Sequence, residues 1–268
     1  MSVSIATWNI NSLRLRIDAV VRFLDAHRPD ILCLQEIKCP EPLFPFEPFR
    51  VRGYDHILVN GQKGYHGVAI ISKRPFLATS KRGFCGKNDA RHAAATIADG
   101  NEDIVIHNFY VPAGGDEPDP AVNEKFAHKL AFIGEMKAWL TGPETDRKAI
   151  LVGDLNIAPH ENDVWSHKQL LKVVSHTPVE TEGLEIVRQA GGWVDAVRHF
   201  VPLDEKLYTW WSYRAADWQL ADRGRRLDHI WVTPRLASRL AGVEIVRGTR
   251  GWERPSDHVP VIARLAAA

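Results

Sequence analysis

Six short apolar runs rich in valine and isoleucine set the strongest constraint on how this chain folds. Each is four to eight apolar residues long and changes abruptly to polar residues at one end, which is typical of buried β-strands. Four runs carry their polar residues at the carboxyl end and the last two at the amino end. The runs cover residues 3–9, 30–36, 103–110, 148–156, 226–233 and 256–265.

Helical patterns alternate with these runs. Apolar residues between Leu13 and Leu24 keep the spacing of one helix face, and Pro29 follows as a stop signal. Residues 123–140 predict a second helix, with a stripe of Phe126, Leu130, Ile133, Met136 and Trp139. Thr177, Pro178 and Glu180 form a capping box that starts a third helix, which Gly191-Gly192 ends. A fourth, short helix follows Thr233-Pro234.

The alternation of strands and helices predicts an α/β fold. Residues 112–120, PAGGDEPDP, form the most loop-like segment, and no linker rich in Gly, Ser or Pro divides the chain. A chain of 268 residues that is 45% hydrophobic has enough apolar side chains for a large core. We therefore expect one domain over residues 1–268, with two sheets buried against each other and helices outside.

Charge, cysteine content and the lack of long apolar runs argue against a strongly basic nucleic-acid-binding protein, a cysteine metal site, a secreted protein and a membrane protein. A net charge of +1 leaves any nucleic-acid binding to a local basic face. The three cysteines, Cys33, Cys39 and Cys85, lack metal-binding spacing, and Cys33 reads as a buried small hydrophobe. We see no signal peptide and no apolar run near the roughly 18 residues that a membrane span needs. These features predict a cytoplasmic protein without a membrane partner.

Polar residues at the strand ends are the place to look for a site in α/β architectures. Any one of them alone is more often a cap or turn residue. Carboxylates that converge repel one another unless a cation neutralises them, and oxygen ligands without cysteine favour Mg²⁺ or Mn²⁺. A hard metal, a spare carboxylate and an imidazole together suit hydrolysis of phosphate esters. The candidates are Asn9, Asn11, Glu36, Tyr110, Asp154, Asn156, Asp228, Asp257 and His258.

Six motifs in order resemble those of the exonuclease III family of abasic-site endonucleases, within the endonuclease/exonuclease/phosphatase superfamily. They are W-N-I-N, L-Q-E-I-K, N-F-Y-V-P, G-D-L-N-I-A-P, R-L-D-H-I and S-D-H-V-P-V, and the similarity runs from Thr7 to Leu265. It is less clear between His160 and Thr177. The resemblance implies a four-layer α/β sandwich like that of deoxyribonuclease I, with two packed mixed β-sheets flanked by helices.

The resemblance also implies a role for each candidate residue. Glu36, with Asn9 and Asp257, would hold the metal against a phosphate oxygen, and Asp154 and Asn156 are further candidate ligands. Asp154 would deprotonate or orient the attacking water, and Asn156 would position that water. Tyr110 would donate a hydrogen bond to the phosphate or assist the leaving group. Asp228 would fix the tautomer of His258, whose other nitrogen faces the scissile phosphate.

Segment 208–228 favours DNA over other phosphodiesters, because it interleaves aromatic residues with arginines. By resemblance, Trp210 and Leu227 line a pocket for a base-less sugar, and Arg214 enters the duplex. Arg225 departs from the pattern, since some relatives have an aromatic residue there; a more polar pocket would change the balance of abasic-site and 3′-end cleavage. Lys63 and Arg91 are further candidate phosphate contacts, although each also reads as an ordinary surface charge. Trp210, Trp211 and Trp218 also read as core or edge-strand residues.

The resulting hypothesis is a Mg²⁺- or Mn²⁺-dependent DNA-repair nuclease. It would cut double-stranded DNA 5′ to abasic sites and trim 3′ ends, leaving a 3′-hydroxyl and a 5′-phosphate, as a monomer with no obligate protein partner. Two alternatives stay open. A phospholipid or inositol phosphodiesterase should bring a membrane-facing apolar loop or a targeting segment, and a catalytically dead nucleic-acid-binding module should have lost Glu36, Asp154 or His258.

Overall fold

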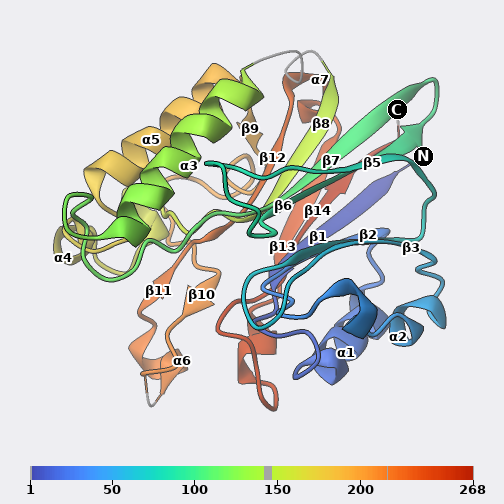
Figure 1. Cartoon of the computed structure of the whole chain (residues 1–268), viewed down its shortest axis with the longest axis horizontal. Helices are drawn as coiled ribbons and strands as arrows, with labels where there is room; N and C mark the ends of the chain where they lie inside the picture. Colours follow the sequence, from blue (N-terminus) through green and yellow to red (C-terminus); the bar gives the residue numbers. More distant parts are fainter. Residues whose placement is uncertain (1, 142–146, 216, 268) are drawn as a thin grey trace.

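The computed structural model describes residues 2–141, 147–215 and 217–267. Its two large sheets each contain six strands (Figure 1). The first sheet has the order β13(Leu240–Ile245), β14(Val261–Leu265), β1(Val3–Asn9), β2(Ile31–Gln35), β4(Val68–Ser72), β3(His56–Asn60). The second has the order β5(Phe76–Lys81), β6(His92–Asp99), β7(Glu102–Tyr110), β8(Lys148–Asp154), β12(Asp228–Val232), β9(Val194–Asp195). Both sheets mix parallel and antiparallel pairs.

Alternation of side chains along the strands builds three apolar layers. In β2, Ile31 and Cys33 face the space between the two sheets, whereas Leu32 and Leu34 face the opposite way. In β8, Ile150 joins the layer between the sheets. The predicted architecture of two sheets packed face to face is therefore confirmed, as is the burial of Cys33.

Helices cover both outer faces of the sheet pair. The first sheet packs against α1(Ile17–His27) and the short α2(Glu47–Arg50), and the second against α3(Glu124–Leu140) and α5(Pro178–Ala190), which lie side by side (Figure 1). The short helices are α4(His167–Leu170), α6(Trp218–Ala221) and α7(Pro234–Ala237). The layer order is thus helix, sheet, sheet, helix, the predicted four-layer sandwich. Among the described residues, no helix is both long and apolar enough to cross a bilayer.

Local signals placed most helix ends correctly. The capping box at Thr177 and Glu180 starts α5, Gly191 caps its end, and α7 follows Thr233. The first helix begins later than the predicted span, because the Leu13 N–H donates to the Ile37 carbonyl at 3.2 Å and Leu13 therefore belongs to the preceding loop. The stripe on α3 also differs: Leu130 and Trp139 are half-buried, while Lys129 and Phe132 are fully buried.

A small two-stranded sheet extends away from the sandwich. It consists of β10(Trp210–Trp211) and β11(Gly224–Arg225), with α6 between them in the chain (Figure 1). Trp210 also forms a bridge with His258, which ties this small sheet to the segment before β14. The predicted loop 112–120 follows β7 and contains no helix or strand.

Candidate active site

Sheet register brings the predicted strand-end residues together. Parallel pairing puts Asn9 beside Gln35 and Tyr110 beside Asp154, and antiparallel pairing sets Asp228 directly opposite Asp154. These ends border a cavity of about 540 Å³. Nine of the predicted site residues line it: Glu36, Tyr110, Asn156, Trp210, Arg214, Arg225, Leu227, Asp257 and His258.

Asn9 lies between two carboxylates. Its Nδ2 donates to Glu36 Oε1 and to Asp154 Oδ2, both at 2.8 Å, and its Oδ1 accepts from the Asn11 N–H at 3.0 Å. Lys38 Nζ lies 2.9 Å from Glu36 Oε2. Burial favours a higher pKa for Glu36, but Lys38 and Asn9 outweigh it and lower the pKa. Glu36 is therefore an ionised carboxylate at the cavity wall.

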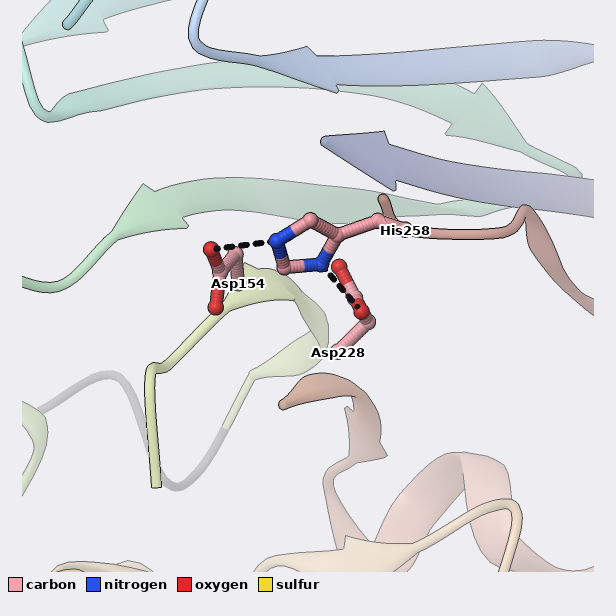
Figure 2. Close-up of side chains that lie close together, drawn as sticks. All are labelled: Asp154, Asp228 and His258. Carbon is pink, nitrogen blue, oxygen red and sulfur yellow. Dashed lines mark hydrogen bonds and ion pairs between the residues drawn. The ribbon is translucent and has the colours of Figure 1, made fainter. Parts of the chain in front are cut away.

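His258 is held between two aspartates (Figure 2). Its Nδ1 lies 2.8 Å from Asp228 Oδ2, and its Nε2 lies 3.6 Å from Asp154 Oδ2. Thr209 Oγ1 donates to the same Asp228 oxygen at 2.6 Å. This chain of contacts fixes the imidazole plane and directs Nε2 toward Asp154, whereas the sequence predicted only the pairing of His258 with Asp228 and a free nitrogen facing the phosphate.

The two ends of this chain have strongly shifted pKa values. Burial raises the pKa of Asp154 to about 7, although the nearby His258 opposes the rise. Burial acts to lower the pKa of His258, but the charges of Asp228 and Asp154 outweigh it and raise the pKa to about 10. An imidazolium is thus stabilised next to a carboxyl group that titrates near neutral pH, a combination suited to moving a proton.

Asp257 lines the cavity and accepts two hydrogen bonds. Trp210 Nε1 donates to its Oδ2 at 2.9 Å, and Asn11 Nδ2 donates to its Oδ1 at 3.1 Å. Lys38 Nζ in turn donates to Asn11 Oδ1 at 2.6 Å. Burial favours a raised pKa for Asp257, but His258 and these donors lower it. A hydrogen bond therefore joins the Asp257 carboxylate to the Trp210 indole. We call Glu36, Asp154 and Asp257 the carboxylate wall of the site, and this bond connects that wall to the aromatic side of the cavity.

Tyr110 presents a protonated phenol to the cavity. Burial, reinforced by Glu36 and Asp154, raises its pKa well above the usual value. The Arg91 guanidinium lies 5.0 Å from the Tyr110 ring centroid, and its Nη1 donates to the Tyr110 carbonyl at 3.3 Å. Arg91 is only 6% exposed, so it is not a mobile surface charge. It lines a neighbouring cavity of about 410 Å³.

Asn156 anchors the loop that follows β8. Its N–H donates to Asp154 Oδ1 at 2.9 Å and its Nδ2 donates to the Val111 carbonyl at 2.8 Å. Asn156, Asn11 and Glu36 all adopt left-handed backbone conformations, with φ of 54°, 47° and 50°. Such conformations are unfavourable for residues other than glycine and concentrate at functional sites.

The tryptophans of segment 208–228 divide into two groups. Trp211 is buried and Trp218 packs against it, so the core interpretation holds for Trp211. Trp210 is half-buried at the cavity with Leu227 and Trp165 around it. Arg214 is exposed at the cavity rim, whereas Lys63 is exposed and lines neither cavity.

The acidic groups suit a hard divalent ion. Asp154, Asp228 and His258 have ligand atoms within 4.8 Å of one another, but both imidazole nitrogens already face carboxylates. Glu36, Asp257 and Asp154 supply the oxygen donors that Mg²⁺ and Mn²⁺ prefer. Asp228 Oδ1 is buried without a hydrogen-bond partner among the described residues, which leaves a further oxygen in the cluster. The donor set therefore fits a metal site on the carboxylate wall.

Two supporting residues were not among the predicted site residues. Thr209 donates to Asp228, and Ser256 Oγ donates to the Asn9 carbonyl at 2.7 Å. Ser256 opens the S-D-H-V-P-V motif and Thr209 lies in segment 208–228, but hydroxyl residues are common in loops and no role was predicted for either.

Comparisons with known proteins agree with this geometry. A model of the endonuclease/exonuclease/phosphatase family matches residues 6–258. The chain is 31% identical to exodeoxyribonuclease III of Haemophilus influenzae, over 97% of this chain and 98% of that protein. It is 28% identical to the DNA repair nuclease APEX1 of Danio rerio, over 99% of this chain and 83% of that protein.

Solved structures of nucleases are also similar to this chain. An AP endonuclease from Archaeoglobus fulgidus superposes with a TM-score of 0.89 at 33% identity, covering 97% of this chain and 98% of that one. The 3′-5′ exonuclease NExo from Neisseria meningitidis also has a TM-score of 0.89, at 32% identity, covering 98% of this chain and 99% of that one.

Proposed function

The chain belongs to the endonuclease/exonuclease/phosphatase family and is 31% identical to an exodeoxyribonuclease III. On that basis we propose that it is a metal-dependent DNA-repair phosphodiesterase. It hydrolyses the DNA backbone 5′ to abasic sites and removes residues or blocking groups from 3′ ends. The products are a 3′-hydroxyl and a 5′-phosphate. The observation that carries this proposal is the imidazole of His258, held between Asp228 and Asp154 beside the Glu36 and Asp257 carboxylates.

Each residue has a chemical role in this proposal. Asp154 accepts a proton from the attacking water, for which a pKa of about 7 is well matched. Asn156 positions that water. The His258 imidazolium stabilises negative charge that develops on the phosphoryl oxygens, and Asp228 fixes its orientation. The Tyr110 phenol donates a hydrogen bond to the phosphate or to the leaving oxygen.

We assign the metal to the carboxylate wall. Glu36 and Asp257 are its principal ligands, with Asp154 and the amides of Asn9 and Asn156 close by. Since the Asn9 Nδ2 already bridges two carboxylates, Asn9 chiefly positions them. Bound Mg²⁺ or Mn²⁺ would neutralise charge on a nonbridging phosphate oxygen.

The substrate is double-stranded DNA that contains abasic sites or 3′ ends. Trp210 and Leu227 give the pocket an apolar wall for an extruded base-less sugar, an inexpensive group to flip out of a duplex. Arg214 lies at the rim, where it can enter the duplex, and Asn11, Arg91 and Lys63 are further candidates for DNA contact. We propose that residues 1–268 form one nuclease domain that acts as a cytoplasmic, nucleoid-associated monomer.

The two alternatives fit less well. The aromatic and arginine-rich cavity wall favours nucleic acid over a lipid or inositol phosphate. A dead binding module is disfavoured, because Glu36 and His258 line one cavity and Asp154 Oδ2 lies 3.6 Å from His258 Nε2.

A cleavage assay tests the proposed function. One duplex carries a single abasic analogue and another an intact recessed 3′ end, each incubated with Mg²⁺ and with or without a chelator. We expect cleavage only in the metal-containing lanes, and Asp154→Asn should lower turnover by orders of magnitude with DNA binding retained. Asp103→Asn, an exposed residue near the start of β7, is the matched control. Intact strands in every metal-containing lane would refute the proposal.

A further inference from the structure

One guanidinium at the edge of the site joins three segments that are far apart in the chain. Arg16 lies at the start of α1 and is half-buried. Its Nε donates to the carbonyls of Arg254 and Pro255, at 3.1 and 3.0 Å, and its Nη1 donates to the Asn11 carbonyl. Its Nη2 donates to the Tyr213 hydroxyl at 3.0 Å. Arg16 therefore fastens together the loop after β1, the loop after β10 and the segment before β14.

Two of these contacts lead to Asp257. Asn11 Nδ2 donates to Asp257 Oδ1 at 3.1 Å, so Arg16 holds the main chain of a residue that orients this carboxylate. Pro255 lies two residues before Asp257, and the Tyr213 hydroxyl also donates to the Pro255 carbonyl, at 2.8 Å. Asn11 has a left-handed backbone, with φ of 47°, which is unfavourable unless the surroundings hold it. The contact with Arg16 is part of what holds it.

The third contact leads to the rim where we expect DNA. Tyr213 directly precedes Arg214, which is exposed at the cavity. The same strand end touches Asp257, because Trp210 Nε1 donates to Asp257 Oδ2 and the Trp211 N–H donates to the Asp257 carbonyl, both at 2.9 Å. A DNA strand bound at Arg214 thus acts on the same segment that holds Asp257.

The guanidinium of Arg16 is suited to hold these parts together. Its four acceptors are neutral, three carbonyl oxygens and one hydroxyl, and all three of its nitrogens donate to them. A planar fork of donors can reach several segments at once, whereas the ammonium of a lysine is a single point of charge. The geometry of Arg16, and not its charge alone, is therefore what the three segments use.

We propose that Arg16 is a positioning residue that couples DNA binding at the Arg214 rim to divalent-metal binding at Asp257. Whichever ligand binds first orders a segment that the other needs, so the second ligand binds at a lower entropy cost. The coupling is reciprocal: DNA raises metal affinity by the factor by which metal raises DNA affinity. This inference rests on the proposed nuclease function and adds a link between its two binding sites.

Calorimetric titration with Mn²⁺ tests the coupling without depending on turnover. The Kd is measured with and without a duplex that carries an abasic analogue and has phosphorothioates at its scissile and terminal linkages; a gel checks that it stays intact. We expect this DNA to lower the wild-type Kd for Mn²⁺ by about tenfold. In Arg16→Met the effect should fall to about twofold or less, whereas Arg264→Met, at an exposed position on β14, should keep the wild-type ratio.

Two further variants keep the test decisive if Arg16→Met does not fold. Arg16→Lys keeps the charge but cannot reach all three segments, so its ratio should also fall. Tyr213→Phe removes one contact and should lower the ratio in part. A wild-type ratio in a folded Arg16 variant would overturn the coupling assignment alone, as would a wild type whose Kd for Mn²⁺ ignores DNA. A wild-type protein that binds neither Mn²⁺ nor the duplex would instead refute the proposed nuclease function, and the coupling with it.

Discussion

Replacement of Lys129 by methionine should cost both stability and turnover. Lys129 and Glu180 are each 0% exposed, with 2.5 Å between Nζ and Oε1. Removal of one member of a buried ion pair costs about 3–5 kcal/mol, because the other charge is left uncompensated. Glu180 still accepts hydrogen bonds from Ser175 and Thr177, so we expect about 3 kcal/mol, near the lower end.

Urea denaturation measures this loss. With a slope near 3 kcal/mol per molar for a chain of this size, the midpoint should fall by about 1 M. The double variant Lys129→Met/Glu180→Gln removes the unpaired charge and should recover part of the stability. A Lys129→Met protein within about 1 kcal/mol of wild type would contradict this reasoning, as would a double variant less stable than the single one.

Turnover should fall for a separate reason. Lys129 Nζ also donates to the Asn156 carbonyl at 2.8 Å, so it holds the main chain of the loop that follows β8 and carries Asn156. A misplacement of about 1 Å in such a loop can cost about 10²-fold in rate. Arg239→Met, which disrupts a buried pair with Asp99 outside the cavity, is the control: it should destabilise the protein while kcat of the folded enzyme stays unchanged.

Three other predictions concern the site, the core and the surface. Asp228→Asn should lower kcat by at least about 10²-fold with little change in DNA affinity, because His258 loses its orienting carboxylate. Steady-state kinetics measure this loss, and a variant with near-normal kcat would show that Asp228 does not have this role. Burial lowers the pKa of His229 to about 3, so below pH 6.5 the unfolded chain binds more protons than the folded protein does. The free energy of unfolding should therefore fall as the pH falls, by about 2 kcal/mol at pH 5 from this residue alone. Urea titrations that show no change in stability with pH would contradict this prediction. Lys63→Ala should reduce the slope of log affinity against log salt by about 1, and an unchanged slope would remove Lys63 from the DNA contacts.

The polar strand ends were predictable because two simple rules place them. Strand periodicity locates each run, and parallel pairing brings the carboxyl ends of β1 and β2, and of β7 and β8, to a common edge. The position of Asp228 opposite Asp154 depends instead on antiparallel register between strands that are more than 70 residues apart by number. The family resemblance paired Asp228 with His258 and did not anticipate its position opposite Asp154.

Buried charges were the hardest part to predict. Lys129 lies three residues after Phe126 and four before Ile133, so its spacing places it on the buried face of α3. Burial of a lysine nevertheless requires a partner, and Glu180 comes from another helix that periodicity cannot locate. Arg91 is similar: its sequence reads as a surface charge, and tertiary packing under Tyr110 makes it part of the interior.

The left-handed backbone at Glu36 and Asn156 has a consequence for protein engineering. Glycine adopts such a conformation without steric cost, so substitution there would relieve local strain even as it removes a chemical group. A directed-evolution campaign that scores thermal tolerance alone would therefore be drawn to these two positions and would return robust but inactive proteins. Selection for catalysis is what keeps side chains there.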